Sequence, residues 1–406
     1  MEIKVVTVIG ANGTMGYNAS AIFASFGNAK VYMVSRDIQK SRNAIDKAVR
    51  AVKSDSIRKN LIPCDYSSLP ECVENSDLIF ESVSEDLKTK SNIIKEIGLY
   101  ATDNAIIATG TSGLSINEIS KVIVESKRKN FYGIHFFNPP YSMTLIELIP
   151  SKYAKKTEEL RIYLETVLLR TVIVCKDSPA FVANRVGFQF LNMALQYAEK
   201  YKEDGGIDYI DSIFGGYTGR AMTPCATVDF VGLDVHKAIV ENLFQNMNDY
   251  EKNSFELPKF VEKLISEGRL GRKTFCGLFK TEIAENGVKT RLVYDVKTGK
   301  YLPAKQYSFP FADEMNNCIR NGDYEEAFTV LNRDQSKEAL ICKDFLKTYI
   351  DYSIFVAKEV CSDMHMADDA MAMGFNWCPP LALSNVLNKT TYSTKYDYRR
   401  FFKAVR

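Results

Sequence analysis

The chain has 406 residues, of which 46% are hydrophobic and 25% charged, and its formal net charge is +2. This length suits two or three domains, and the composition is that of an ordinary globular protein. The small net charge favours neither nucleic acid nor a membrane as a partner, and no apolar run approaches the ~20 residues of a membrane span. The first residues form a strand and include an acidic second residue, unlike a signal peptide, so we expect a cytoplasmic location.

Cysteine and histidine are used in different ways along the chain. The nine cysteines show no repeated spacing, which predicts free thiols in a reducing compartment and no metal site. Histidine occurs only three times, so each position deserves a separate chemical interpretation.

The N-terminal residues carry the pattern of a dinucleotide-binding turn. Residues 3–10 predict a buried strand, residues 17–26 a helix and residues 30–34 a second strand. Glycines between the first two elements allow a tight turn and a close approach of a pyrophosphate to the helix N-terminus. An ordinary βα turn is the alternative. We expect the cofactor to contact the residues of this turn, namely Gly10, Asn12, Gly13, Thr14, Met15 and Gly16.

The residues after the second strand bear on the choice between NAD(H) and NADP(H). The glycine spacing is G-x-x-G-x-x-G, with Asn12 as a one-residue insertion. Ser35 and Arg36 stand where an NAD-selective protein places a carboxylate for the ribose 2′-OH, and they favour a 2′-phosphate and NADP(H). In the alternative, Arg36 is solvated and Asp37 reaches the ribose.

Alternation of strands and helices continues to about residue 150. Residues 77–83, 105–109 and 131–137 predict further strands, with a charged helix at 37–54 and helices at 86–100 and 115–125. This alternation predicts an α/β Rossmann-type, doubly wound parallel sheet, which binds ligands at the carboxyl ends of its strands. Candidate site residues fall at these ends, namely Gly10, Ser35, Glu85, Ser112 and His135.

The second half of the sequence predicts an all-α domain. Asp177-Ser178-Pro179 is a helix start, and we expect one long helix over residues 180–202. A faint repeat relates residues 203–235 to 363–387, each after a long helix, which predicts two degenerate helical units. The polar segment with turns at Asn286-Gly287 and Thr298-Gly299 predicts a connection or hairpin. The expected domains are residues 1–177, 178–280 and 313–406, with a connection at 281–312.

The segment 131–147 contains the residues most suited to catalysis. His135 lies in an apolar run that Pro139-Pro140 ends, and Glu147 follows twelve residues later inside a second apolar run. Histidine removes a hydroxyl proton readily at neutral pH, and a buried carboxylate on its other ring nitrogen fixes the tautomer. The alternative is a core histidine and an edge-strand glutamate. His236 and His365 lie in predicted helices and are interpreted as structural.

Several ordered motifs resemble the L-3-hydroxyacyl-CoA dehydrogenase family. They include the HFFNP run that begins at His135, Glu147, and Thr111-Ser112 with Leu114. They also include DSPAFVANR from Asp177, VDFVGLD from Val228 and GRLGRKT from Gly268. The likeness covers residues 3–280 nearly continuously. The later segment resembles the second, degenerate C-terminal repeat of longer family members.

The resemblance implies functional roles for particular residues. His135 would be the general base and Glu147 its orienting partner, with Ser112, Asn138 and Asn184 on the substrate side. Glu85 and Lys90 match positions near the nicotinamide ribose. The implied substrate is an acyl-CoA in fatty acid metabolism such as β-oxidation, and the implied assembly is a homodimer or, with a second repeat in one chain, a monomer. A dehydrogenase of a non-CoA 3-hydroxy acid and a non-catalytic nucleotide-binding protein are the alternatives.

Three places depart from the family pattern. Gly110 and Gly113 stand in place of an asparagine and a serine, so hydrogen bonding to the substrate is expected to differ. Residues 140–142 replace small apolar residues, and we expect them to reshape the acyl pocket.

Overall fold

The computed structural model describes residues 1–283, 287 and 289–404 as two compact units. Unit 1 comprises residues 1–181 and unit 2 residues 182–406, so the division lies four residues beyond the predicted boundary at 177. Among the described residues, no helix is long and apolar enough to cross a membrane.

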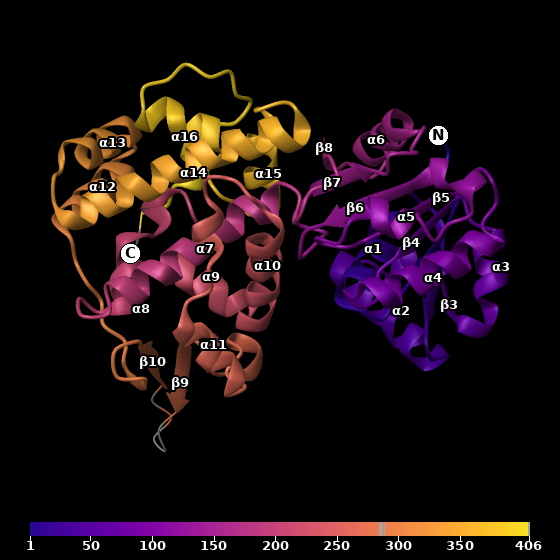
Figure 1. Ribbon diagram of the computed structural model, residues 1–406, viewed down its shortest axis with the longest axis horizontal. Helices are drawn as coiled ribbons and strands as arrows, with labels where there is room; N and C mark the ends of the chain where they lie inside the picture. The colour runs from indigo at the N-terminus through magenta and orange to yellow at the C-terminus, as the bar shows by residue number, and fades with distance from the viewer. Residues whose placement is uncertain (284–286, 288, 405–406) are drawn as a thin grey trace. The chain divides into compact units, whose positions relative to one another are not determined.

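Unit 1, coloured indigo to magenta in Figure 1, is built on one eight-stranded sheet. Its strand order is β3-β2-β1-β4-β5-β6-β7-β8. Strands β1 to β6 are parallel, β7 runs antiparallel to β6, and β8 is parallel to β7. The predicted doubly wound fold is therefore confirmed. The strands are β1 (Val5–Ile9), β2 (Lys30–Ser35), β3 (Leu61–Asp65), β4 (Leu78–Glu81), β5 (Ile106–Thr109), β6 (Phe131–Phe136), β7 (Leu145–Pro150) and β8 (Thr171–Val174).

Helices cover both faces of this sheet because successive strand residues point to opposite sides. On one face, apolar residues of α1, α2 and α6 form a single buried cluster with Val6 and Val8 of β1. On the other face, the Thr7 hydroxyl donates to the carbonyl oxygen of Cys72 in α3. The helices are α1 (Thr14–Ser25), α2 (Ile38–Val52), α3 (Leu69–Glu74), α4 (Leu87–Tyr100), α5 (Ile116–Ser120) and α6 (Thr157–Thr166), with 3₁₀ turns η1 (Asp55–Asn60), η2 (Tyr66–Ser68) and η3 (Glu125–Asn130).

Two predictions about local structure need correction. Strand β3 was not predicted, because Pro63 interrupts its apolar run; the structure tolerates this proline because β3 is the edge strand of the sheet. The helix expected over residues 180–202 begins only at Ala183. Ala180 and Phe181 instead adopt left-handed conformations, with φ of 55° and 52°, which a right-handed helix excludes.

Unit 2 is mainly helical and also contains a three-stranded antiparallel sheet, which the prediction of a connection or hairpin described only in part. The turn expected at Asn286-Gly287 includes Asn286, which lies outside the described residues. The sheet comprises β9 (Phe279–Ile283), β10 (Lys289–Asp295) and β11 (Lys300–Pro303). The helices are α7 (Ala183–Lys200), α8 (Gly206–Ile213), α9 (Pro224–Val231), α10 (Leu233–Asn246), α11 (Lys259–Ser266), α12 (Pro310–Asn321), α13 (Tyr324–Arg333), α14 (Lys337–Cys361), α15 (Met366–Gly374) and α16 (Pro380–Leu387), with 3₁₀ turns η4 (Gly216–Thr218), η5 (Lys252–Phe255), η6 (Arg272–Thr274) and η7 (Tyr398–Phe401).

Arg220 lies at the centre of unit 2, fully buried between aromatic rings. Its guanidinium carbon lies 3.9 Å from the ring centre of Phe190, 4.6 Å from that of Tyr349 and 4.7 Å from that of Trp377. One nitrogen donates to the carbonyl oxygen of Thr218 at 3.0 Å, and two have no hydrogen-bond partner among the described residues. Burial lowers the pKa of Arg220 to about 10. The side chain therefore contributes mainly by packing against the three rings.

We expect Arg220→Ala to lower the free energy of unfolding by about 3–5 kcal/mol, because it leaves a cavity between three rings. Arg220→Met fills most of that volume and removes a buried charge, so its effect should stay within about 1 kcal/mol. Denaturant titration measures both values. The exposed Arg400→Ala is the control, and equal losses for the Ala and Met variants would contradict the packing role.

Candidate active site

The glycine turn between β1 and α1 is packed so closely that two of its positions exclude side chains. A Cβ on Gly10, whose φ is +79°, would lie 2.3 Å from the carbonyl oxygen of Ser82. A Cβ on Gly16 would lie 2.3 Å from the carbonyl oxygen of Gly10. Gly13 caps the twelve-residue helix α1, whose first backbone N–H groups are free to bind an anion. These residues therefore fit the pyrophosphate of a dinucleotide.

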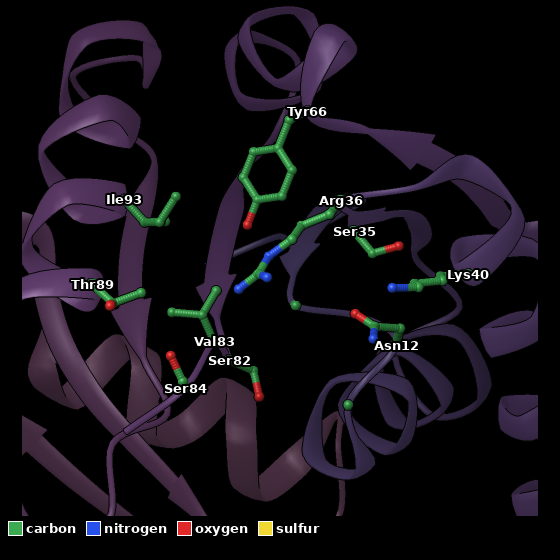
Figure 2. Close-up of a pocket in the computed structure, with 12 residues that line it drawn as sticks. Asn12, Ser35, Arg36, Lys40, Tyr66, Ser82, Val83, Ser84, Thr89 and Ile93 are labelled. Atoms are coloured by element: carbon green, nitrogen blue, oxygen red, sulfur yellow. The ribbon is translucent and has the colours of Figure 1, made fainter. Parts of the chain in front are cut away.

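A pocket of about 470 Å³ opens beside this turn at the carboxyl ends of β1, β2 and β4 (Figure 2). It contains two cations, Arg36 and Lys40, and none of the residues that line it in the described chain is acidic. Figure 2 shows the Tyr66 hydroxyl directed toward the guanidinium group of Arg36. The lining residues are Gly10, Asn12, Gly13, Ser35, Arg36, Lys40, Tyr66, Ser82, Val83, Ser84, Thr89 and Ile93.

Ser35 and Asp37, at the end of β2, are both engaged in local hydrogen bonds. Ser35 is buried, and its hydroxyl lies 2.5 Å from the Ser41 hydroxyl and 3.1 Å from the carbonyl oxygen of Asp37. The Ser41 hydroxyl donates to the carbonyl oxygen of Cys64. Both acceptors within reach of the Ser35 hydroxyl proton, Ser41 Oγ and the carbonyl oxygen of Asp37, therefore belong to the protein. The Asp37 carboxylate caps α2 by accepting from the backbone N–H of Gln39 at 2.7 Å.

Glu85 organises the loop that follows β5. One of its carboxylate oxygens accepts from the Thr111 hydroxyl at 2.5 Å, the Ser112 backbone N–H at 2.8 Å and the Ser112 hydroxyl at 3.2 Å. Burial raises the pKa of Glu85, but Lys90, Thr111 and Ser112 together hold it below its ordinary value. The structure thus brings together two of the predicted residues, Glu85 and Ser112, and holds Glu85 as a carboxylate.

His135 and Glu147 form a buried pair on adjacent antiparallel strands. The register of β6 and β7 places them directly opposite each other, and His135 Nδ1 lies 2.6 Å from Glu147 Oε2. The relative exposure of His135 is 6% and that of Glu147 is 0%. An ionised carboxylate only accepts hydrogen bonds, so beside one Nδ1 carries the ring proton and neutral imidazole leaves Nε2 as an acceptor.

Aromatic rings enclose the imidazole, whereas the two other histidines have different surroundings. The His135 ring centre lies 4.5 Å from that of Phe137 and 5.8 Å from that of Phe181. His365 is exposed and paired with Asp363. His236 is fully buried in unit 2, where Nε2 lies 3.0 Å from Asn192 Oδ1.

The loop between β6 and β7 differs from the family pattern and is anchored on its core side. The Tyr141 ring centre lies 5.7 Å from that of Phe26, and the buried Arg170 donates to the carbonyl oxygen of Pro140 at 3.0 Å.

A side chain at Gly110 would run into the Phe80 ring, at 2.7 Å. The large ring of Phe80 therefore gives a physical reason for glycine at this position.

Two predicted substrate residues stand apart from these contacts. Asn138 is exposed in the loop after β6, three residues beyond His135. Asn184 belongs to unit 2, where it is buried in the first turn of α7.

The sequence analysis assigned no role to four residues of this region, namely Lys40, Tyr66, Glu81 and Thr111, of which Thr111 was quoted only as part of a motif. Lys40 lies in the first turn of α2, which begins two residues after Arg36, so its position in the sequence could have indicated a second cation beside Arg36. Tyr66 follows β3, the strand that was not predicted. Glu81 was assigned to a strand interior, where a carboxylate gives no indication of its partners.

Comparisons with known proteins agree with this geometry. A family model described as 3-hydroxyacyl-CoA dehydrogenase, NAD binding domain, matches residues 5–178, and the C-terminal domain of the same name matches residues 181–281. The human mitochondrial hydroxyacyl-coenzyme A dehydrogenase is 30% identical over 293 residues, which cover 68% of this chain and 91% of that protein. A probable 3-hydroxyacyl-CoA dehydrogenase of Bacillus subtilis (strain 168) is 28% identical over 320 residues, which cover 78% of this chain but only 39% of that protein.

The fold also matches solved structures over nearly the whole chain. A 3-hydroxybutyryl-CoA dehydrogenase from Escherichia coli K12 superposes with a TM-score of 0.71 and 21% identity, covering 95% of this chain and 91% of that one. This likeness extends to the region beyond residue 281, where neither family model matches.

The burial of His236 predicts a pH dependence of stability. Burial lowers the pKa of His236 to about 3, from 6.5 when unfolded. Between these values the unfolded chain binds the proton and the folded chain does not. The contribution of His236 to the free energy of unfolding is therefore fully present above pH 6.5. It falls by about 1.4 kcal/mol per pH unit as the pH drops toward 3.

We expect His236→Asn to flatten this dependence, because asparagine keeps a polar group near Asn192 but does not titrate. Denaturant titrations between pH 4 and pH 7 measure the slope, with the exposed His365→Asn as the matched control. An unchanged slope in His236→Asn, or an equal change in the control, would contradict the assignment.

Proposed function

The chain belongs to the 3-hydroxyacyl-CoA dehydrogenase family, and from this membership we propose that it interconverts (S)-3-hydroxyacyl-CoA and 3-oxoacyl-CoA. The observation that supports this activity best is the buried contact of 2.6 Å between His135 and Glu147. The cofactor is a nicotinamide dinucleotide, in line with the family model that covers residues 5–178. When bound, its ring supplies the acceptor or donor of hydride.

His135 is proposed as the general acid and base. In oxidation, Nε2 accepts the proton of the substrate 3-hydroxyl group while hydride leaves the same carbon. In reduction, the imidazolium returns that proton to the 3-oxo oxygen. Glu147 accepts a hydrogen bond from the Nδ1–H group in both directions and stabilises the imidazolium, as the carboxylate of a catalytic triad does.

Substrate and cofactor contacts are proposed for other predicted residues. Ser112 and Asn184 bind the 3-oxygen or the thioester, and Asn138 lines the same site. Glu85 and Lys90 lie on the side of the nicotinamide ribose, and Glu85 already fixes Ser112.

We expect His135→Gln to lower kcat by about a hundredfold or more, because the variant lacks a group that transfers a proton at neutral pH. Cofactor affinity should stay unchanged. Glu147→Gln should cost less, since the imidazole remains. Turnover is measured with acetoacetyl-CoA by the absorbance of the reduced nicotinamide, and affinity by its fluorescence.

His365→Gln is the matched control, because it removes an exposed histidine. Wild-type turnover in His135→Gln would refute the proposed base. Turnover of acetoacetate at the rate of acetoacetyl-CoA would instead favour a dehydrogenase that does not need CoA.

A preference for NADP(H) is also proposed, now with Arg36 and Lys40 as the phosphate-binding residues. Both cations lie in the pocket beside the glycine turn, and neither forms an ion pair with a described residue. The Ser35 hydroxyl is hydrogen-bonded within the protein, and the Asp37 carboxylate caps α2. Binding of a 2′-phosphate is therefore assigned to Arg36 and Lys40. An ammonium and a guanidinium suit a dianionic phosphate, which an acidic residue at this position would repel.

We expect Arg36→Gln with Lys40→Gln to raise KM for NADPH by about tenfold to a hundredfold and to change KM for NADH by less than about threefold. Steady-state kinetics with both cofactors measure this. Arg42→Gln is the control, because Arg42 is exposed on the same helix but does not line the pocket. Equal KM values for NADH and NADPH, before and after the substitutions, would refute the preference.

A further inference from the structure

A buried ion pair lies behind the site, between the end of β4 and helix α4. The side chain of Glu81 has 0% relative exposure and that of Lys90 has 1%, and Lys90 Nζ lies 3.0 Å from Glu81 Oε1. Such a pair is costly to desolvate unless both members satisfy their remaining hydrogen bonds. The contacts of the two residues therefore decide what the pair does in the fold.

Glu81 satisfies its hydrogen bonds within the sheet. Oε1 also accepts from the backbone N–H of Val83 at 2.6 Å, and Oε2 accepts from the Thr109 hydroxyl at 2.6 Å. Glu81 thus links the end of β4 to the end of β5, next to the loop that carries Ser112.

Lys90 uses all three of its donors on protein oxygens. Beside Glu81 Oε1, Nζ lies 3.3 Å from the carbonyl oxygen of Val83 and 3.3 Å from Glu85 Oε2. An ammonium group has three N–H bonds and no acceptor. With its three donors directed at protein oxygens, the buried ammonium is connected to the loop after β5 through Glu85.

Glu85 connects Lys90 to the loop after β5. Its other oxygen, Oε1, accepts from Thr111 and from both the backbone and the hydroxyl group of Ser112. The Thr111 hydroxyl in turn accepts from the backbone N–H of Gly113 at 3.3 Å and of Leu114 at 3.0 Å. One carboxylate thereby fixes the backbone on both sides of the Ser112 side chain.

We infer that Glu81 and Lys90 are positioning residues, which hold Glu85 in place so that Glu85 orients Ser112 toward the substrate. The chain of contacts runs from Glu81 to Lys90, from Lys90 to Glu85 and from Glu85 to Ser112, all within unit 1. The inference rests on the proposed function for the role of Ser112. The contacts themselves do not depend on the proposed function.

The test removes the ion pair as a whole. Lys90→Met alone leaves Glu81 buried without its cation, so the melting temperature should fall. The double variant Glu81→Gln/Lys90→Met replaces the pair with neutral groups of similar shape and should recover most of that loss. If the pair were purely structural, the double variant would also recover the activity of the wild-type protein. A positioning pair would leave kcat/KM with acetoacetyl-CoA lower by about tenfold or more.

Two readouts separate positioning from stability. Carbon-13 NMR of glutamate carboxylates, assigned with Glu85→Gln, should show the titration of Glu85 at higher pH in the double variant, because the ammonium that faces it is gone. Thr111 and Ser112 face Glu85 from the other side and remain, and Glu81 lies behind Lys90. In a Ser112→Ala background, the loss of kcat/KM caused by the double variant should shrink to less than about twofold.

Lys88→Met is the matched control, because Lys88 is an exposed lysine on the same helix. Wild-type kcat/KM and an unshifted Glu85 titration in the double variant would overturn the inference, as would an equal loss in the presence and absence of the Ser112 hydroxyl. A wild-type protein that turns over no acyl-CoA would refute the proposed function. The NMR titration would then still decide whether Lys90 controls the charge of Glu85.

Discussion

The antiparallel pairing of β6 with β7 is the constraint on which the site depends. A carboxylate with no solvent exposure is stable only beside a partner, and the register of these two strands supplies His135 to Glu147. All preceding strands of the sheet are parallel, so this reversal is the one place in the described sheet where two chain segments only twelve residues apart face each other across a ladder. The reversal of the chain between β6 and β7 therefore brings His135 and Glu147 into contact.

The two sides of the site are stabilised in different ways. At the glycine turn, close backbone packing excludes side chains at Gly10 and Gly16. Behind the loop that carries Ser112, oppositely charged side chains alternate from the buried Glu81 through Lys90 to the partly exposed Glu85. Packing fixes the first arrangement, whereas the second needs each ionised group to keep its neighbour. A single neutral substitution in this row should therefore disturb the structure more than the change in side-chain volume suggests.

Sequence reasoning found the fold and the centre of the site because both rest on local patterns. The alternation of strands and helices predicted the sheet, and the pairing of His135 with Glu147 was one of two interpretations of their spacing, which the register of β6 and β7 supports. It failed where tertiary contacts decide. The left-handed backbone at Ala180 and the hydrogen bonds that occupy Ser35 leave no mark in the sequence. The role of Glu81 depends on a lysine one helix away, which a pattern along the chain does not show.

Pro63 has a consequence for the behaviour of the protein in a crowded solution. It lies in the middle of β3, which is an edge of the eight-stranded sheet. An exposed strand edge offers unpaired backbone groups to the edge of another molecule, and this is a common beginning of aggregation. Proline has no N–H to offer there, so a second sheet cannot extend a regular ladder across this position. The residue that concealed β3 from sequence analysis thus also interrupts the row of backbone N–H groups on this edge strand.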